Sequence, residues 1–143
     1  MIPQKVALTA AAICLTAALG HAGEFTVSPT SLQFSASDRV ATLTVMSSGP
    51  EIASGQVRVL RWYNEGGRND LEPTREMTAS PPSLHLGANQ EVTIRLLRKS
   101  KGPVRGQECY RVLIDKFPDL NANSPQVTFT IRQSVPLCFG INP

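Results

Sequence analysis

Groups that carry out enzyme chemistry are scarce in this sequence. Only two histidines and three cysteines occur among 143 residues, and there is neither a G-x-S-x-G nucleophile motif nor a glycine-rich phosphate-binding loop. His85 is the one histidine outside the N-terminal 22 residues. Its setting, Leu84-His85-Leu86 before a glycine turn, is typical of an exposed residue at a strand end. We therefore expect no enzyme; a triad that combines His85 with one of the many Ser and Asp residues is the alternative.

Ligands for metals and anions are equally few. Zinc and copper sites need several side chains that converge on one point, and Cys109, Cys138 and His85 are too scattered, so we expect no metal and no cofactor. One basic stretch, Arg95–Arg105, holds five cations and no acid. An anionic partner would use such a stretch, but no aromatic residues interleave with the charges, as single-strand binders require. We interpret it as a solvated loop between two strands and expect no nucleic-acid partner.

Long hydrophobic runs are absent except at the N-terminus. Met1–Ala22 contains Lys5, an apolar run over Val6–Leu19 and small residues at its end, which is the pattern of a cleaved secretory signal peptide. The run is shorter than the roughly 20 residues that span a bilayer, so a transmembrane anchor is the less favoured alternative. We expect residues 23–143 to form one exported domain that does not insert into a membrane.

The sequence is rich in short runs of Val, Thr, Ile and Leu separated by Gly, Pro, Asn and Ser. No long segment has helical periodicity. We predict seven strands: Phe25–Phe34 (interrupted by Pro29), Arg39–Met46, Gln56–Tyr63, Leu71–Thr78, Glu91–Leu97, Cys109–Phe117 and Gln126–Phe139. This pattern indicates an all-β, immunoglobulin-like seven-stranded β-sandwich, in which we expect Trp62 of the third strand to be a packed core residue.

The last predicted strand has one apolar and one polar face. Side chains alternate between the two faces of a strand, so residues two positions apart share a face. On one face of this segment every residue is apolar except Gln133. The apolar series is Val127, Phe129, Ile131, Val135, Leu137 and Phe139. Such a strand either packs into its own core or offers an apolar edge to another protein.

Two cysteines remain after removal of the signal peptide. Cys109 begins the sixth predicted strand and Cys138 lies near the end of the seventh, so an antiparallel hairpin brings them to the same end. A disulfide between them is geometrically plausible in an exported protein; two buried thiols are the alternative.

Several segments together resemble the PapD-like periplasmic pilus chaperones. The most specific are Thr78–Gly87, reading TASPPSLHLG, followed by Gln90–Leu96, and the strand Cys109–Asp115, reading CYRVLID. Phe25–Thr30 resembles the family's first strand, and Ser134–Leu137 its seventh strand, especially in the archaic (Csu-like) branch. The resemblance extends over Phe25–Pro143, and it implies the N-terminal immunoglobulin-like domain of a two-domain chaperone whose second domain is absent here.

This resemblance implies a periplasmic protein that binds pilus or fimbrial subunits and also meets an outer-membrane usher. Such a chaperone lends its seventh strand to a hydrophobic groove of the subunit by β-strand addition. The implied subunit-binding residues are Val127, Phe129, Ile131 and Val135. Each is worth roughly 1.5–3 kcal/mol on burial, and inward packing in its own sandwich is the alternative for each.

The sequence departs from the family in its basic anchor for the subunit's terminal carboxylate. The two positions that carry this anchor in many members fall near Ser31 and Val135, and neither is basic here. Arg111 resembles the basic residue of the archaic branch and is the first candidate, since an arginine binds a carboxylate bidentately. Arg132 is the second candidate, and an ion pair of Arg111 with Asp115 or Glu108 is the structural alternative.

Two other interpretations stay open. The chain would be a structural protein if it were a pilus subunit or a secreted immunoglobulin-like adhesion module. A subunit needs an N-terminal donor extension, and here strand-like sequence begins at Phe25, directly after the signal peptide. The other interpretation is a truncated fragment without function.

Overall fold

The protein is an all-β structure. The computed structural model describes residues 24–118 and 130–140. Within these ranges the chain forms ten strands and no helix. The strands are β1 (Phe25–Ser28), β2 (Leu32–Phe34), β3 (Val40–Ser47), β4 (Ala53–Tyr63), β5 (Asp70–Pro73), β6 (Met77–Ser80), β7 (Ser83–Leu86), β8 (Glu91–Arg98), β9 (Glu108–Lys116) and β10 (Ile131–Phe139).

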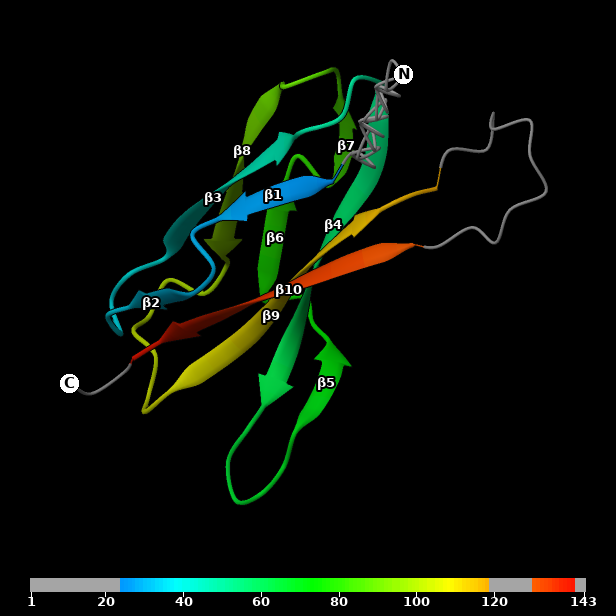
Figure 1. Ribbon diagram of the computed structural model, residues 1–143. Coiled ribbons are helices and arrows are strands. Elements are labelled where there is room, and N and C mark those ends of the chain that lie inside the picture. The colour runs from blue at the N-terminus through cyan, green and yellow to red at the C-terminus, as the bar shows by residue number, and fades with distance from the viewer. Residues whose placement is uncertain (1–23, 119–129, 141–143) are drawn as a thin grey trace, which may run out of the picture.

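The strands form two sheets that pack face to face. One sheet has the order β1-β3-β8-β6, and the other has the order β2-β10-β9-β4-β5, with β7 also paired to β4 (Figure 1). All of these pairings are antiparallel except β2 with β10, which is parallel. The two-sheet architecture confirms the predicted all-β sandwich.

The core lies between the sheets because each strand turns alternate side chains inward. In β3 and β8 the inward residues are nearly inaccessible: Val45, Ile94 and Leu96 are all 0% exposed. The facing sheet contributes Val112, Leu137 and Phe139, also 0% exposed. Gly55 of β4 leaves room for the Phe25 ring of β1, since a Cβ added to Gly55 would lie 2.7 Å from Phe25 Cε2. This close approach brings β1 near the start of β4.

Three departures from the predicted strands occur, and two of them have a clear local cause. Phe25–Phe34 divides around Pro29 into β1 and β2, which belong to different sheets. Leu71–Thr78 divides in the same way into β5 and β6, because the chain crosses between sheets after Pro73. A proline lacks the hydrogen-bond donor that a ladder needs, which favours a break or an edge position at Pro29 and Pro73. The short strand β7 was not predicted; it contains His85, which is exposed as expected.

The prediction that Trp62 belongs to the core is wrong. Trp62 pairs with Cys109 across β4 and β9, on the face of the larger sheet that points away from the core. It is half-buried, and its Nε1 donates a hydrogen bond of 2.8 Å to Asn69 Oδ1. The core position at this end belongs to Tyr110, the neighbour of Cys109 on the opposite face. The parity of β4, set by Val57 pointing inward, turns Trp62 outward.

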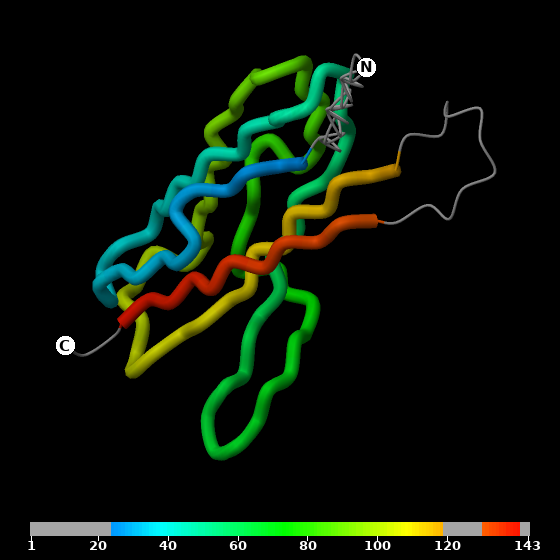
Figure 2. Tube along the Cα trace, viewed as in Figure 1, coloured from blue at the N-terminus to red at the C-terminus, as the bar shows by residue number. Residues whose placement is uncertain are grey.

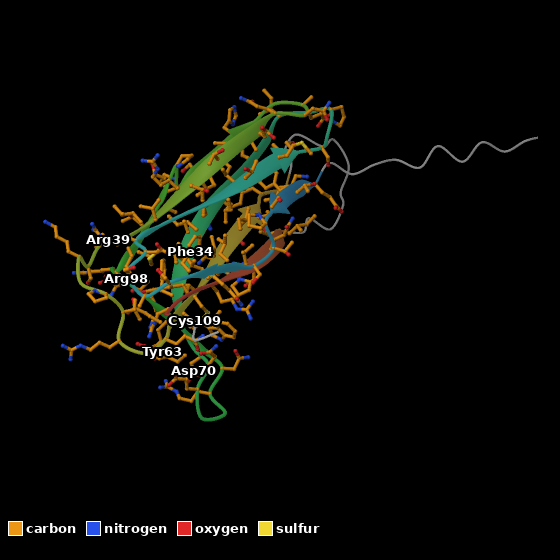
Figure 3. All side chains as sticks on the ribbon, turned by 90° about the vertical axis from the view of Figure 1, so that its left-hand side faces the viewer. Phe34, Arg39, Tyr63, Asp70, Arg98 and Cys109 are labelled. Atoms are coloured by element: carbon orange, nitrogen blue, oxygen red, sulfur yellow. A yellow bond between two sulfur atoms is a disulfide. The ribbon has the colours of Figure 1, made fainter. Side chains whose placement is uncertain are left out.

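The hairpin of β4 and β5 extends beyond the sandwich (Figure 2). All four residues of β5 are exposed. Figure 3 shows Cys109, Tyr63 and Asp70 following one another from the sandwich toward the tip of this hairpin. Ring contacts support it: the guanidinium carbons of Arg61 and Arg68 lie 5.1 and 4.8 Å from the centre of the Tyr63 ring.

Candidate functional site

One edge of β10 is the most distinctive feature of the larger sheet. On one side, β10 pairs with β9 along its whole length, from Ile131 opposite Lys116 to Phe139 opposite Glu108. On the other side, β2 pairs only with Leu137–Phe139. Among the described residues, no strand pairs with this second edge over residues 131–136. An unpaired edge of this kind is a template for a strand of another chain.

The predicted binding residues are placed differently along β10. Val127 and Phe129 lie outside the described residues. Ile131 is 41% exposed beside the open edge, and its contact with a partner stays a prediction. Val135 is only 3% exposed and belongs to the hydrophobic core. We therefore correct the assignment of Val135. It faces the core opposite Val112 and packs within its own sandwich, so it is not available to a partner.

Gln133 explains how the polar break in the apolar series is accommodated. It shares the inward face with Ile131 and Val135, and its Nε2 donates a hydrogen bond to the backbone oxygen of Phe25 in β1. This contact links the two sheets, because Phe25 lies in β1 of one sheet and Gln133 lies in β10 of the other. The sequence showed the interruption but not the partner, since the two residues are 108 positions apart.

Charged residues gather on the outer face of the same strands. Asp115 of β9 is 1% exposed, and its carboxylate accepts hydrogen bonds from Arg132 Nε at 2.6 Å, Arg58 Nη2 at 3.0 Å and Gln56 Nε2 at 3.1 Å. The hydrogen bond from Arg132, with those from Gln56 and Arg58, outweighs burial and holds the pKa of Asp115 below its usual range. The carboxylate is therefore ionised at neutral pH.

The two predicted anchor arginines have different surroundings. Arg132 is bound to Asp115 and remains 54% exposed. Arg111 pairs with neither Asp115 nor Glu108 among the salt bridges of the described residues; its guanidinium carbon lies 4.0 Å from the centre of the Trp62 ring. Such a cation–π contact orients the guanidinium without neutralising it. Arg58 and Asp115 form a charged cluster with Arg132, and neither of them was predicted as a site residue.

A disulfide joins Cys109 and Cys138 on the outer face. The two residues are directly opposite in the register of β9 and β10, with a Cα–Cα distance of 4.1 Å. Both are buried although they lie outside the core. The bond ties β10 to β9 at the end of the strand that is farthest from Ile131.

The basic stretch Arg95–Arg105 is only partly the solvated loop that we expected. Arg95 and Arg98 lie within β8, and Arg98 is 6% exposed. Arg98 contacts Glu108 and donates to the backbone oxygens of Ser100 and Gly102, which fixes the loop after β8. Sequence reasoning missed this role because the acid, Glu108, lies ten residues away in another strand.

The remaining surface offers little other chemistry. Two hollows of about 220 and 260 Å³ lie on either side of Arg61 and Tyr63 at the base of the β4–β5 hairpin, and their linings are mostly polar. Within residues 24–118 and 130–140, no group of His, Cys, Asp and Glu could hold a metal ion. The same part of the chain contains no helix of the length and apolar character that a membrane crossing requires.

Comparison with known proteins identifies the family. The model of the family described as "Pili and flagellar-assembly chaperone, PapD N-terminal domain" matches residues 24–140. Because this match covers most of the chain, the chain belongs to the PapD-type pilus-assembly chaperones, a family of periplasmic, non-enzymatic proteins, and the matched region is their N-terminal domain. A search of curated proteins gave no match.

Solved structures agree with this fold. The chaperone–tip adhesin complex CsuC–CsuE of archaic Csu pili from Acinetobacter baumannii matches with a TM-score of 0.69 and 24% identity, over 81% of this chain and 56% of that one. The Salmonella enterica complex of SafA pilin with the SafB chaperone matches with a TM-score of 0.64 and 21% identity, over 81% and 53%. The E. coli chaperone DraB matches with a TM-score of 0.62 and 17% identity, over 84% and 58%. The chain thus spans a little over half the length of these structures, and the immunoglobulin-like sandwich is confirmed.

Proposed function

We propose that this protein is exported to the periplasm and binds pilus or fimbrial subunits by lending them β10. The open edge of β10 over residues 131–136 is the observation that carries this proposal. It offers backbone donors and acceptors to an incoming strand, and alternate side chains then set the register. The family supports the same conclusion, because solved relatives include chaperones in complex with a pilin or a tip adhesin.

The structure of β10 is suited to pairing with a subunit while the strand stays part of its own sandwich. Its second half is anchored by core residues, by pairing with β2 and by the disulfide, while its first half carries the exposed Ile131. The strand therefore presents an apolar side chain from a fixed base. Val127 and Phe129, on the same parity, remain proposed contacts, and Arg111 and Arg132 remain proposed partners of a subunit carboxylate. An outer-membrane usher is the proposed second partner. We propose no cofactor.

The test is capture of a subunit from the native periplasm by the tagged chain, with Ile131→Asp as the variant. We expect recovery of a small pilin-like subunit in about equal amount by the unmodified chain. Ile131→Asp should lower the recovery at least about tenfold, because a charge replaces an apolar contact worth roughly 1.5–3 kcal/mol.

Val40→Asp is the matched control, since Val40 is 46% exposed on the other sheet. Both variants should keep the thermal unfolding midpoint near that of the unmodified chain. Equal recovery by all three proteins would contradict the assignment of the β10 edge, and recovery of a well-folded chain without any subunit would favour a structural role.

A further inference from the structure

The end of β8 and the loop that follows it present several cations to solvent. Four cations of the stretch Arg95–Arg105 have exposed side chains: Arg95, Lys99, Lys101 and Arg105. Among residues 24–118 and 130–140, none of these four takes part in an ion pair. The fifth cation, Arg98, is buried, and its Nε lies 4.0 Å from a carboxylate oxygen of Glu76 and 3.2 Å from one of Glu108. The two acids that contact this segment thus face the buried arginine, and the exposed cations keep their charge toward solvent.

Two arginines hold the backbone of this loop in place. Arg98 Nη1 donates hydrogen bonds to the backbone oxygens of Ser100 and Gly102, at 3.2 and 2.7 Å. Arg39, directly before β3, donates to the backbone oxygens of Lys99 and Ser100, at 3.2 and 3.1 Å. Figure 3 shows Arg39 and Arg98 close together at this end of the molecule. Because the carbonyl groups of the loop bind these two arginines, the lysine side chains are presented from a fixed backbone.

Two exposed aliphatic side chains lie next to the cations. Val40 of β3 and Leu97 of β8 are directly opposite in the register, and they are 46% and 36% exposed. The next outward pair along the same strands is Thr42 with Arg95. On the outward faces of β3 and β8 the one carboxylate is Glu91, at the far end of β8. This end of the smaller sheet is therefore both apolar and basic.

We propose that this surface binds anionic phospholipid membranes without spanning them. We call it the basic–aliphatic surface, and it consists of Val40, Arg95, Leu97, Lys99, Lys101 and Arg105. Exposed aliphatic side chains enter the headgroup region of a bilayer, and lysines and arginines near an anionic bilayer are attracted by its surface potential. The cations come from a strand and a loop and are not oriented by acids, which fits a fluid layer of phosphates better than the fixed carboxylates of a protein.

The position of the basic–aliphatic surface leaves the open half of β10 accessible. β9 begins beside the loop at Glu108, whereas Ile131 is opposite Lys116 at the other end of β9. These two ends are roughly 25 Å apart, at about 3.3 Å for each residue of a strand. A chain bound to a membrane by this surface can therefore still pair with a partner near Ile131. The inference goes beyond the proposed function and does not depend on it.

Vesicle binding by the full chain purified from the periplasm tests the proposal. The vesicles contain phosphatidylcholine, either alone or with roughly a third of phosphatidylglycerol, and the bound fraction is measured by flotation at low and at high salt. The variants are Lys99→Gln combined with Lys101→Gln, and Val40→Asp. Arg68→Glu is the matched control, because it lowers the net charge by as much as the double variant does but lies between β4 and β5, where Arg68 is 54% exposed.

We expect the unmodified chain to bind the vesicles that contain phosphatidylglycerol, to ignore phosphatidylcholine and to be released by salt. The double variant should bind at least about tenfold more weakly, since each cation near an anionic bilayer contributes about a fivefold increase in affinity. Val40→Asp should weaken binding about fivefold or more, because it brings an acid to the bilayer surface, and Arg68→Glu should bind like the unmodified chain. All four proteins should keep the same thermal unfolding midpoint and the same capture of subunits.

Three outcomes overturn the proposal: no binding to anionic vesicles, unchanged binding by the double variant, or an equal loss in Arg68→Glu, which would show a response to net charge alone. If vesicles are not bound but an acidic periplasmic protein is captured, and only the double variant loses it, the surface belongs to a protein partner instead. Loss of subunit capture with intact vesicle binding contradicts the proposed function and leaves the membrane surface in place.

Discussion

At the scale of single residues, buried Asp115 shows how one carboxylate organises a surface. It is almost fully buried on the outer face, yet its partners Arg58 and Arg132 are 42% and 54% exposed. The cost of burying the charge is offset by four hydrogen bonds from three charged or polar residues. The same carboxylate therefore orients both arginines on the open face of the sheet.

The lowered pKa of Asp115 predicts a pH-dependent contribution to stability. The contribution is complete above the unfolded-state pKa of about 4 and is lost as the pH falls through the folded-state pKa, because the unfolded state binds the proton more readily. Asp115→Asn should lower the free energy of unfolding by about 1–2 kcal/mol at neutral pH, the exposure of its partners limiting the effect. Urea unfolding of both proteins between pH 7 and about pH 3 measures the difference, which should shrink toward the acid end.

Asp70→Asn provides the control for this comparison, because Asp70 pairs with Arg68 and is 56% exposed. Its difference from the unmodified protein should be close to zero at every pH. A constant difference for Asp115→Asn across the pH range would show that lost packing, not the ionised carboxylate, causes the destabilisation.

At the scale of elements, β10 combines a fixed half with an open half. The disulfide closes a loop between cysteines 29 residues apart, and a loop of this length stabilises the fold by about 3–4 kcal/mol through the entropy of the unfolded chain. Replacing both cysteines, Cys109→Ala with Cys138→Ala, should lower the free energy of unfolding by about that amount, measured by urea unfolding.

Reduction of the unmodified protein should produce a loss of similar size. The double variant should still fold, because Leu137 and Phe139 keep β10 in the core. If the double variant and the unmodified protein unfold at the same urea concentration, the bond does not constrain the unfolded chain.

At the scale of the whole molecule, strands from both ends of the described chain close the sandwich. β2 pairs with β10, and the residues of one core come from both sheets. We therefore expect the chain purified from the periplasm to unfold in one cooperative transition, with coincident midpoints by circular dichroism and tryptophan fluorescence.

The intact mass of that protein should correspond to residues 23–143, which tests the proposed signal peptide. A mass that includes Met1–Ala22 would contradict cleavage. Separate transitions by the two probes, or no transition, would favour the interpretation of the chain as a fragment that does not fold alone.

The sequence by itself determined the all-β class, the sandwich architecture, the chaperone family and the alternation of side chains along the last strand, which the structure describes over Ile131–Phe139. These depend on local alternation and on contiguous motifs such as TASPPSLHLG. Tertiary structure decided which apolar residues of this parity are buried: Val135 and Ile131 share a parity, but Val135 lies in the core and Ile131 is 41% exposed. It also decided the outward position of Trp62, the division of two predicted strands between sheets, and the assembly of Arg58, Asp115 and Arg132. These features depend on register between strands far apart in the chain, which no local pattern encodes.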